Sequence, residues 1–213
     1  MKYVKSFSKR GHLITEGKLE SKTIINIDIQ PEYEDGITFD LYKWVKFINK
    51  SYKSNDIVFL YNGKYTVGSL SEEDYVMWLL ELGVKEKVVD GSTFYDKGYA
   101  FFRYCMDNGI DDDSIIDLIK YMIRHDITDS RNFDEEMWKN FMEETDHSRQ
   151  EVRDLLEFAD DMVNIPDLMK FLERYKHSNI VLTGGGVNEC LKEVEIALMS
   201  LDKKYEILAE YTY

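Results

Sequence analysis

Short runs of β-branched and apolar residues recur along the chain, and segments of helical character follow them. TIINIDIQ at residues 23–30 has the length and composition of a buried strand, and so do DIVFLYNG at 56–63 and NIVLTG at 179–184. Residues 40–52 and 71–83 carry apolar side chains at helical intervals. Alternation of strands with helices is typical of a parallel α/β sheet. The sequence therefore predicts the α/β class, with an open parallel sheet between helices in three layers.

Three further segments complete the predicted α/β core. EKVVD at 86–90 and YEILAEYTY at 205–213 are expected to be strands, and residues 188–202 are expected to form a helix. The core domain then consists of residues 23–104 and 179–213.

The intervening residues 105–178 have a different character. No glycine occurs between Gly109 and Gly184, and the block is strongly acidic. Its apolar residues fall at helical spacing, as in Ile115, Leu118, Ile119 and Met122. This pattern predicts an acidic, all-helical insertion of three or four helices.

Charge and composition restrict the expected partners and location. Residues 1–22 form a basic arm of net charge +4, which leaves −18 for the rest of the chain. An acidic body repels phosphate backbones, so general nucleic-acid binding is not expected. No stretch approaches the roughly 18 apolar residues of a membrane span, and the arm lacks the apolar centre of a secretory signal. Only Cys105 and Cys190 are present, so a cytoplasmic protein without a disulfide scaffold is predicted.

Polar side chains follow several of the predicted strands. Asp28 and Gln30 end the first strand, Lys97 comes after the strand at 86–90, and Cys190 lies beyond the glycine turn that follows NIVLTG. Open parallel sheets bind ligands at the carboxyl ends of their strands. A lysine favours a thiolate, a carboxylate accepts the thiol proton, and amides at a helix start hold an oxyanion. Asp28, Lys97 and Cys190 are therefore the candidate catalytic residues.

These residues, in this order, resemble the motifs of the isochorismatase-like cysteine hydrolases, which include nicotinamidases and other amidases. Members of that family begin with a strand that ends in Asp-x-Gln, and INIDIQPEYEDGI is similar. They carry a lysine ahead of an aromatic patch, as in YDKGYAFF. They then have a strand, a glycine and a cysteine six residues later, which matches Gly184 and Cys190 in VLTGGGVNECLKE.

The resemblance implies an activity and a role for each residue. Asp28 would act as general base, Lys97 would stabilise the thiolate, and Cys190 would attack a carbonyl or imine carbon to form a covalent intermediate that water resolves. The expected substrate is a small molecule with an amide, ester or related C–N or C–O bond. Backbone amides near Val187 and Cys190 would hold the oxyanion. The implied substrate- and oxyanion-binding residues are Gln30, Gly186, Val187 and Asn188.

The chain departs from the family pattern at three places. Lys97 and Cys190 are 93 positions apart, where the family has little more than a short helix. The chain stops at Tyr213, soon after the last predicted strand, where relatives continue. YNGKYTVGS has no histidine where nicotinamidases place metal ligands, so neither a metal nor a cofactor is expected.

The sequence leaves other interpretations open. Cys190 would also suit a buried structural position, and Lys97 could pair with Asp28 in a purely structural role. The glycine run could cradle a phosphate, although it lacks the lysine and hydroxyl of a P-loop. A non-catalytic interaction module, of viral or mobile-element type, could keep this fold and bind a protein through residues 105–178 or the basic arm. A homo-oligomer is equally left open.

Overall fold

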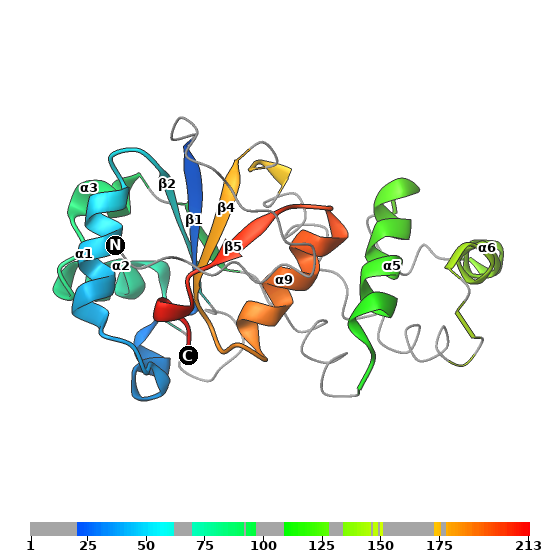
Figure 1. Cartoon of the computed structure of the whole chain (residues 1–213), viewed down its shortest axis with the longest axis horizontal. Coiled ribbons are helices and arrows are strands. Elements are labelled where there is room, and N and C mark those ends of the chain that lie inside the picture. Colours follow the sequence, from blue (N-terminus) through cyan, green and yellow to red (C-terminus); the bar gives the residue numbers. More distant parts are fainter. Residues whose placement is uncertain are drawn as a thin grey trace. The chain divides into compact units, whose positions relative to one another are not determined.

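The computed structural model of the chain is shown in Figure 1. It describes residues 21–61, 70–91, 93–96, 109–127, 134–145, 147–148, 150, 173–175 and 178–213. The chain divides into two compact units: one holds Met1–Asp96, His177–Leu191 and Lys204–Tyr213, and the other holds Lys97–Lys176 and Lys192–Lys203. The basic arm lies outside the described residues except for Ser21 and Lys22, and the predicted domain limits stay predictions.

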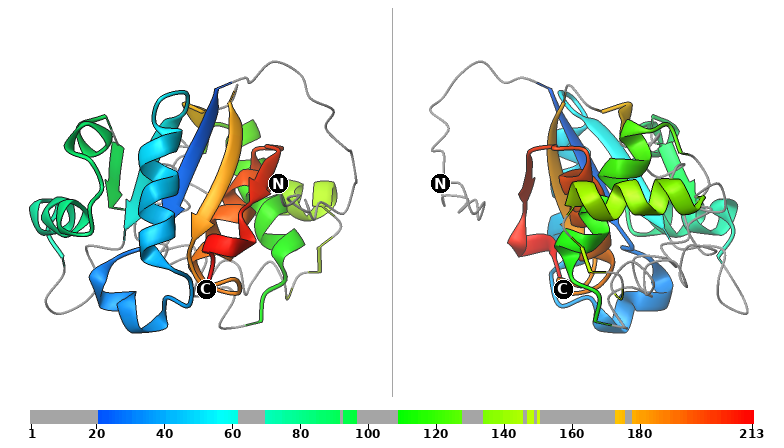
Figure 2. Two further views of the ribbon diagram at one scale, coloured as in Figure 1. Left: turned by 60° about the vertical axis from the view of Figure 1, so that its left-hand side comes forward. Right: turned by 90° about the vertical axis from the view of Figure 1, so that its right-hand side faces the viewer.

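The first unit is built on a five-stranded sheet in the order β3-β2-β1-β4-β5. All neighbouring strands pair in parallel, and Ile25 in the central strand lies opposite Val58 on one side and Leu182 on the other. The predicted open parallel α/β sheet is therefore confirmed (Figure 1, Figure 2). The strands are β1 (Lys22–Ile27), β2 (Asp56–Tyr61), β3 (Thr93–Asp96), β4 (Asn179–Gly184) and β5 (Tyr205–Ile207).

Three helices of this unit pack on one face of the sheet. They are α1 (Leu41–Ser51), α2 (Glu72–Glu81) and α3 (Glu86–Asp90). Side chains cap the first two helices, because Asp40 accepts a hydrogen bond from the Lys43 amide and Ser71 accepts one from the Asp74 amide. The buried side chains of this face include Ile24, Trp44, Ile48, Phe59, Tyr75, Leu79, Val88 and Val181.

A buried asparagine connects four elements beneath α1. The Asn26 amide nitrogen donates to the Val58 carbonyl at 3.0 Å. Its oxygen accepts from the Trp44 indole at 3.1 Å and from the Thr183 hydroxyl at 2.7 Å. Asn26 is fully buried, and a polar side chain is stable in such a place only when it is hydrogen-bonded. The network therefore ties β1, β2, β4 and α1 together.

The direction of the strand order reverses between β1 and β4. From β1 the chain runs through α1 to β2 on one side, whereas β4 and then β5 lie on the other side. Ligands of open α/β sheets bind outside the carboxyl ends of the strands at such a switch point. The short 3-10 helix η1 (Pro31–Gly36) follows β1 at this edge.

The predicted strand EKVVD is wrong, since these residues form α3 and the third strand is β3. The Val88 amide donates to the Lys85 carbonyl at 2.8 Å, and Val88 and Val89 are buried among the side chains of the face that carries α1 and α2. A run of five residues is too short to set a period, so packing decides its conformation.

The predicted strand at 205–213 is only partly correct. It pairs with β4 as β5 at Tyr205–Ile207, and the Leu208 amide still donates to the Leu182 carbonyl. The chain then turns into the 3-10 helix η4 (Ala209–Tyr211). This turn stacks Tyr211 on Phe47, with ring centroids 5.2 Å apart, which an extended strand end would not achieve.

The second unit is helical where it is described. Its helices are α5 (Asp112–Arg124), α6 (Glu135–Thr145) and the part of α9 (Cys190–Ser200) that follows Leu191. Helix α5 buries Ile115, Leu118, Ile119 and Met122, so the predicted helical pattern is confirmed there. The similar pattern at residues 155–162 lies outside the described residues. Within the described ranges, no helix is long and apolar enough to cross a membrane.

Replacing Asn26 by leucine should lower the free energy of unfolding by at least about 3 kcal/mol, because the Trp44, Thr183 and Val58 groups all lose their buried partner. Adding Thr183→Val should cost less than the sum of the two single changes, since the hydroxyl no longer needs a partner. Urea unfolding measures both effects. Asn49→Ala, which removes exposed hydrogen bonds, is the control. A loss under about 1 kcal/mol in Asn26→Leu would contradict the network's importance.

Candidate active site

Asp28 follows β1 in a conformation that side-chain-bearing residues rarely adopt, with φ of +47°. Its amide donates to the Leu60 carbonyl at 2.8 Å, and its carbonyl accepts from the Tyr213 hydroxyl at 2.9 Å. The next carbonyl, that of Ile29, accepts from the Tyr75 hydroxyl at 3.0 Å. Asp28 is fully buried. Backbone strain of this kind persists where surrounding contacts enforce it, and it is frequent at functional sites.

The glycine turn after β4 lies directly beside the end of β1. Gly184 and Gly185 have φ of +74° and +68°. A Cβ atom at Gly184 would overlap the Ile27 carbonyl oxygen, and one at Gly185 would lie 2.9 Å from the Leu191 amide nitrogen. Only glycine therefore fits at these two positions. The absence of side chains lets the turn approach Ile27 and Ile29 at the end of β1 closely.

Cys190 is the first residue of α9, and the glycine turn positions it. The Gly186 carbonyl accepts hydrogen bonds from the Glu189 amide at 2.9 Å and from the Leu191 amide at 3.3 Å, which starts the helix. Cys190 is buried, with 8% of its surface exposed. A thiolate at a helix N-terminus is stabilised by the helix dipole and the unpaired amides there. This is the location expected of a nucleophilic cysteine.

The Tyr213 phenol lies at the end of β1, where its hydroxyl donates to the Asp28 carbonyl. Burial, followed by the negative charges of Asp28 and then Cys190, raises the pKa of Tyr213 far above its usual value. Tyr33 and Glu189 act in the same direction more weakly. The hydrogen bonds of Tyr213 to the Asp28 carbonyl, the Gly185 carbonyl and the Val187 amide place this residue between the end of β1 and the glycine turn before α9. The phenol therefore stays protonated and donates its hydrogen bond.

A second tyrosine fixes the same strand end from α2. Burial, and next the charge of Asp28, raise the pKa of Tyr75. The Tyr75 ring stacks on Tyr61, with centroids 4.7 Å apart. Neither Tyr75 nor Tyr213 could be predicted from the sequence as a site residue, since no local pattern distinguishes them from other aromatic residues of the chain.

The other predicted site residues differ in their exposure and in their hydrogen bonds. Gln30 is buried and donates to Glu32 at 3.3 Å. The Val187 side chain is 52% exposed, while its amide donates to the main-chain oxygen of Tyr213 at 3.0 Å. Asn188 is exposed. Lys97 lies outside the described residues, so its relation to Cys190 stays a prediction.

The first unit contains two reactive side chains near the switch point, the Asp28 carboxylate after β1 and the Cys190 thiol at the start of α9. The carboxylate can take the thiol proton, and a helix start can hold negative charge. Among the residues that the structure describes, no group of three or more His, Cys, Asp or Glu side chains could hold a metal ion.

Comparison of the chain with protein-family models, with curated proteins and with solved structures found no match. Functional inference therefore rests on the geometry of the site and on the chemistry of its residues.

Replacing Tyr213 by phenylalanine should cost about 1 kcal/mol of unfolding free energy at neutral pH, because the hydrogen bond to the Asp28 carbonyl is lost. The substitution should also change how the free energy of unfolding depends on pH in the alkaline range. The pKa of Tyr213 is raised in the folded state, so this stabilisation is complete below pH about 10 and is lost as the pH rises further.

Urea unfolding at pH 7 and above pH 10 tests this expectation. The wild-type chain should lose stability more steeply in the alkaline range than Tyr213→Phe does. Tyr42→Phe, a change at a tyrosine that is 65% exposed on α1, is the control and should follow the wild type. Equal alkaline slopes in wild type and Tyr213→Phe would contradict the assignment.

Proposed function

We propose that the chain is an isochorismatase-like cysteine hydrolase that cleaves a small amide, ester or related C–N or C–O bond. In this proposal the sheet is the centre of a three-layer domain, and residues 105–178 are an acidic helical insertion. The observation that carries it is that Tyr213 is hydrogen-bonded both to Asp28 after β1 and to the glycine turn that leads to Cys190, at the switch point. The strained backbone of Asp28 and the glycine turn before Cys190 add support.

The first half of the proposed reaction forms a thioester. Asp28 accepts the Cys190 proton, and the charge of Lys97 stabilises the thiolate. The sulfur attacks the carbonyl carbon, a C–S bond forms, and the carbonyl electrons move to oxygen, where amides at the glycine turn hold them. Collapse of this intermediate breaks the C–N bond, and the amine leaves with the proton from Asp28.

The second half returns the enzyme to its starting state. Water loses a proton to Asp28 as its oxygen attacks the thioester carbon. The C–S bond then breaks, and Cys190 leaves as a thiolate that recovers the proton. The products are a carboxylic acid and an amine, and the scheme requires no cofactor.

A non-catalytic role is the second candidate. It is favoured by the small exposure of Cys190 and by the Val187 amide, which already donates to Tyr213. In that case the chain keeps the fold and the site residues without catalytic activity, and it binds a protein partner through residues 105–178 or the basic arm. The thiol chemistry below separates the two candidates.

Iodoacetamide at neutral pH should label Cys190 before Cys105 if Cys190 is the nucleophile, because the thiolate is the reactive form. Peptide mass spectrometry assigns the labelled residue. With a panel of small amides and esters, Cys190→Ser should lower kcat/KM by at least about a thousandfold, whereas Cys105→Ser should leave it unchanged. Equally slow labelling of both cysteines, without turnover of any substrate, would favour the non-catalytic role.

Asp28→Asn separates the chemistry of Asp28 from its backbone conformation. Asparagine tolerates the left-handed region, so the variant should fold and unfold much as the wild type does. It cannot accept the thiol proton, so kcat/KM should fall by about a hundredfold or more. Circular dichroism and steady-state kinetics give the two readouts. Full activity in Asp28→Asn would exclude Asp28 as the general base.

A further inference from the structure

Tyr213 is bound to the glycine turn as one residue of an added strand. Its amide donates to the Gly185 carbonyl at 3.3 Å, and its main-chain oxygen accepts from the Val187 amide at 3.0 Å. One residue that bonds in this way to both neighbours of Gly186 forms a parallel β bridge. Extended peptides use the same main-chain pattern when they bind an exposed edge. The turn therefore offers a donor and an acceptor suited to a peptide-type ligand.

The side chain of Tyr213 completes this mode of binding. Its hydroxyl reaches across the site to the Asp28 carbonyl at 2.9 Å, and the charges of both Asp28 and Cys190 act on it. One residue thus uses the Val187 amide, which is a candidate oxyanion donor, together with the main-chain carbonyl of Asp28. A substrate at Cys190 would need the same positions.

We propose that Tyr213 occupies the position of a peptide-like substrate, and that residues 209–213, here called the latch, must leave before that substrate binds. This inference rests on the proposed function, whose substrate class it narrows. The ligand that fits is an N-acylated aromatic amino-acid derivative. Its N–H would replace the Tyr213 amide at Gly185, its C=O would accept from Val187, and its ring would lie toward Asp28.

The latch is held by the three hydrogen bonds of Tyr213 and by the packing of Tyr211. Ala209 and Glu210 are exposed, and residues 211–213 are half-buried. The anchor outside the site is Tyr211, which stacks on Phe47 at 5.2 Å and meets the edge of Phe39 at 5.8 Å. Segments with few buried contacts open at low free-energy cost, as elements that move during binding must.

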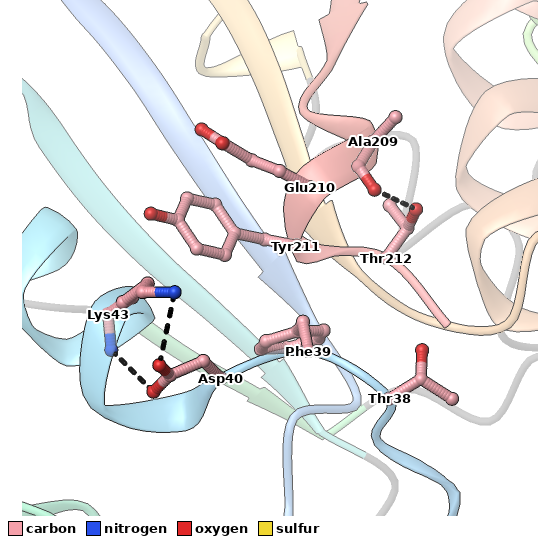
Figure 3. Close-up of a pocket in the computed structure, with 8 residues that line it drawn as sticks. All are labelled: Thr38, Phe39, Asp40, Lys43, Ala209, Glu210, Tyr211 and Thr212. Atoms are coloured by element: carbon pink, nitrogen blue, oxygen red, sulfur yellow. Dashed lines mark hydrogen bonds and ion pairs between the residues drawn. The ribbon is translucent and has the colours of Figure 1, made fainter.

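A pocket of about 350 Å³ separates the latch from the start of α1 (Figure 3). Its walls are residues 38–40 and Lys43 on one side and residues 209–212 on the other. In Figure 3 the Thr212 hydroxyl donates to the Ala209 carbonyl, a bond that stays within the latch. The latch can therefore move as one piece, with its own hydrogen bond kept.

The test weakens the latch at its anchor and leaves the site residues unchanged. In a full-length Cys105→Ser background, Tyr211→Ala should raise the rate of Cys190 labelling by iodoacetamide about tenfold, which corresponds to about 1.4 kcal/mol of easier opening. Labelling follows the population of the open form when opening is fast. Val89→Ala, a buried change in α3 away from the latch, controls for general destabilisation and should give a smaller increase.

N-acetyl-L-tyrosinamide serves as the probe ligand. It should protect Cys190 in Tyr211→Ala more than in the parent chain, where the latch competes for the position. N-acetyl-L-alaninamide, which has the same main-chain groups and no ring, should protect less. Circular dichroism and urea unfolding confirm that each variant is folded.

The outcomes separate this inference from the proposed function. Labelling of Tyr211→Ala no faster than that of Val89→Ala would overturn the latch, whatever the catalytic activity. Protection by the tyrosine derivative no better than by the alanine derivative would overturn the assigned ligand class. Faster labelling with selective protection, but no hydrolysis of any amide or ester, would support the latch and refute the hydrolase.

Discussion

The end of β1 is the point on which the candidate site depends. Asp28 takes a left-handed conformation because three neighbours hold the chain there: the Leu60 carbonyl, the Tyr213 hydroxyl and, through the next residue, the Tyr75 hydroxyl. These partners come from β2, from the latch and from α2. A conformation that costs free energy locally is thus supported by three separate parts of the first unit. The position of Asp28 relative to the glycine turn follows from this support.

The sheet could be predicted from local sequence because buried parallel strands have a simple signature. Runs of β-branched and apolar residues such as TIINI and NIVLT have few other folded uses. EKVVD has the same composition and forms a helix, since five residues carry no period and the packing of Val88 and Val89 decides. Composition alone is thus informative for the long runs and misleading for the short one.

The candidate site likewise contains residues that could be predicted from the sequence and residues that could not. Asp28 and Cys190 could be proposed from their places after apolar runs, because strand ends in a parallel sheet share an edge. Tyr75 and Tyr213 could not, because each acts through one hydrogen bond to a main-chain carbonyl distant in sequence. A hydroxyl that binds a main-chain carbonyl leaves no pattern in neighbouring residues. Asn26 is a similar case, since its partners Trp44 and Thr183 are set by the register of β1 and β4.

In the proposed mechanism, the charge balance of the site determines whether the Cys190 thiolate can form. The negative charges of Asp28, Cys190 and Glu189 all raise the pKa of the Tyr213 phenol. A thiolate close to a buried carboxylate is disfavoured by repulsion and by loss of hydration, so the two groups hold one negative charge more easily than two. A cation changes that balance by pairing with both. Lys97 directly follows β3 in sequence and lies outside the described residues, so it is the cation that the proposed mechanism assigns to this role. In the proposed mechanism, the lysine charge at Cys190 makes the thiolate accessible for attack. Without that charge, one proton shared by the two groups would be the more stable state, and the arrangement would support the fold without catalysis.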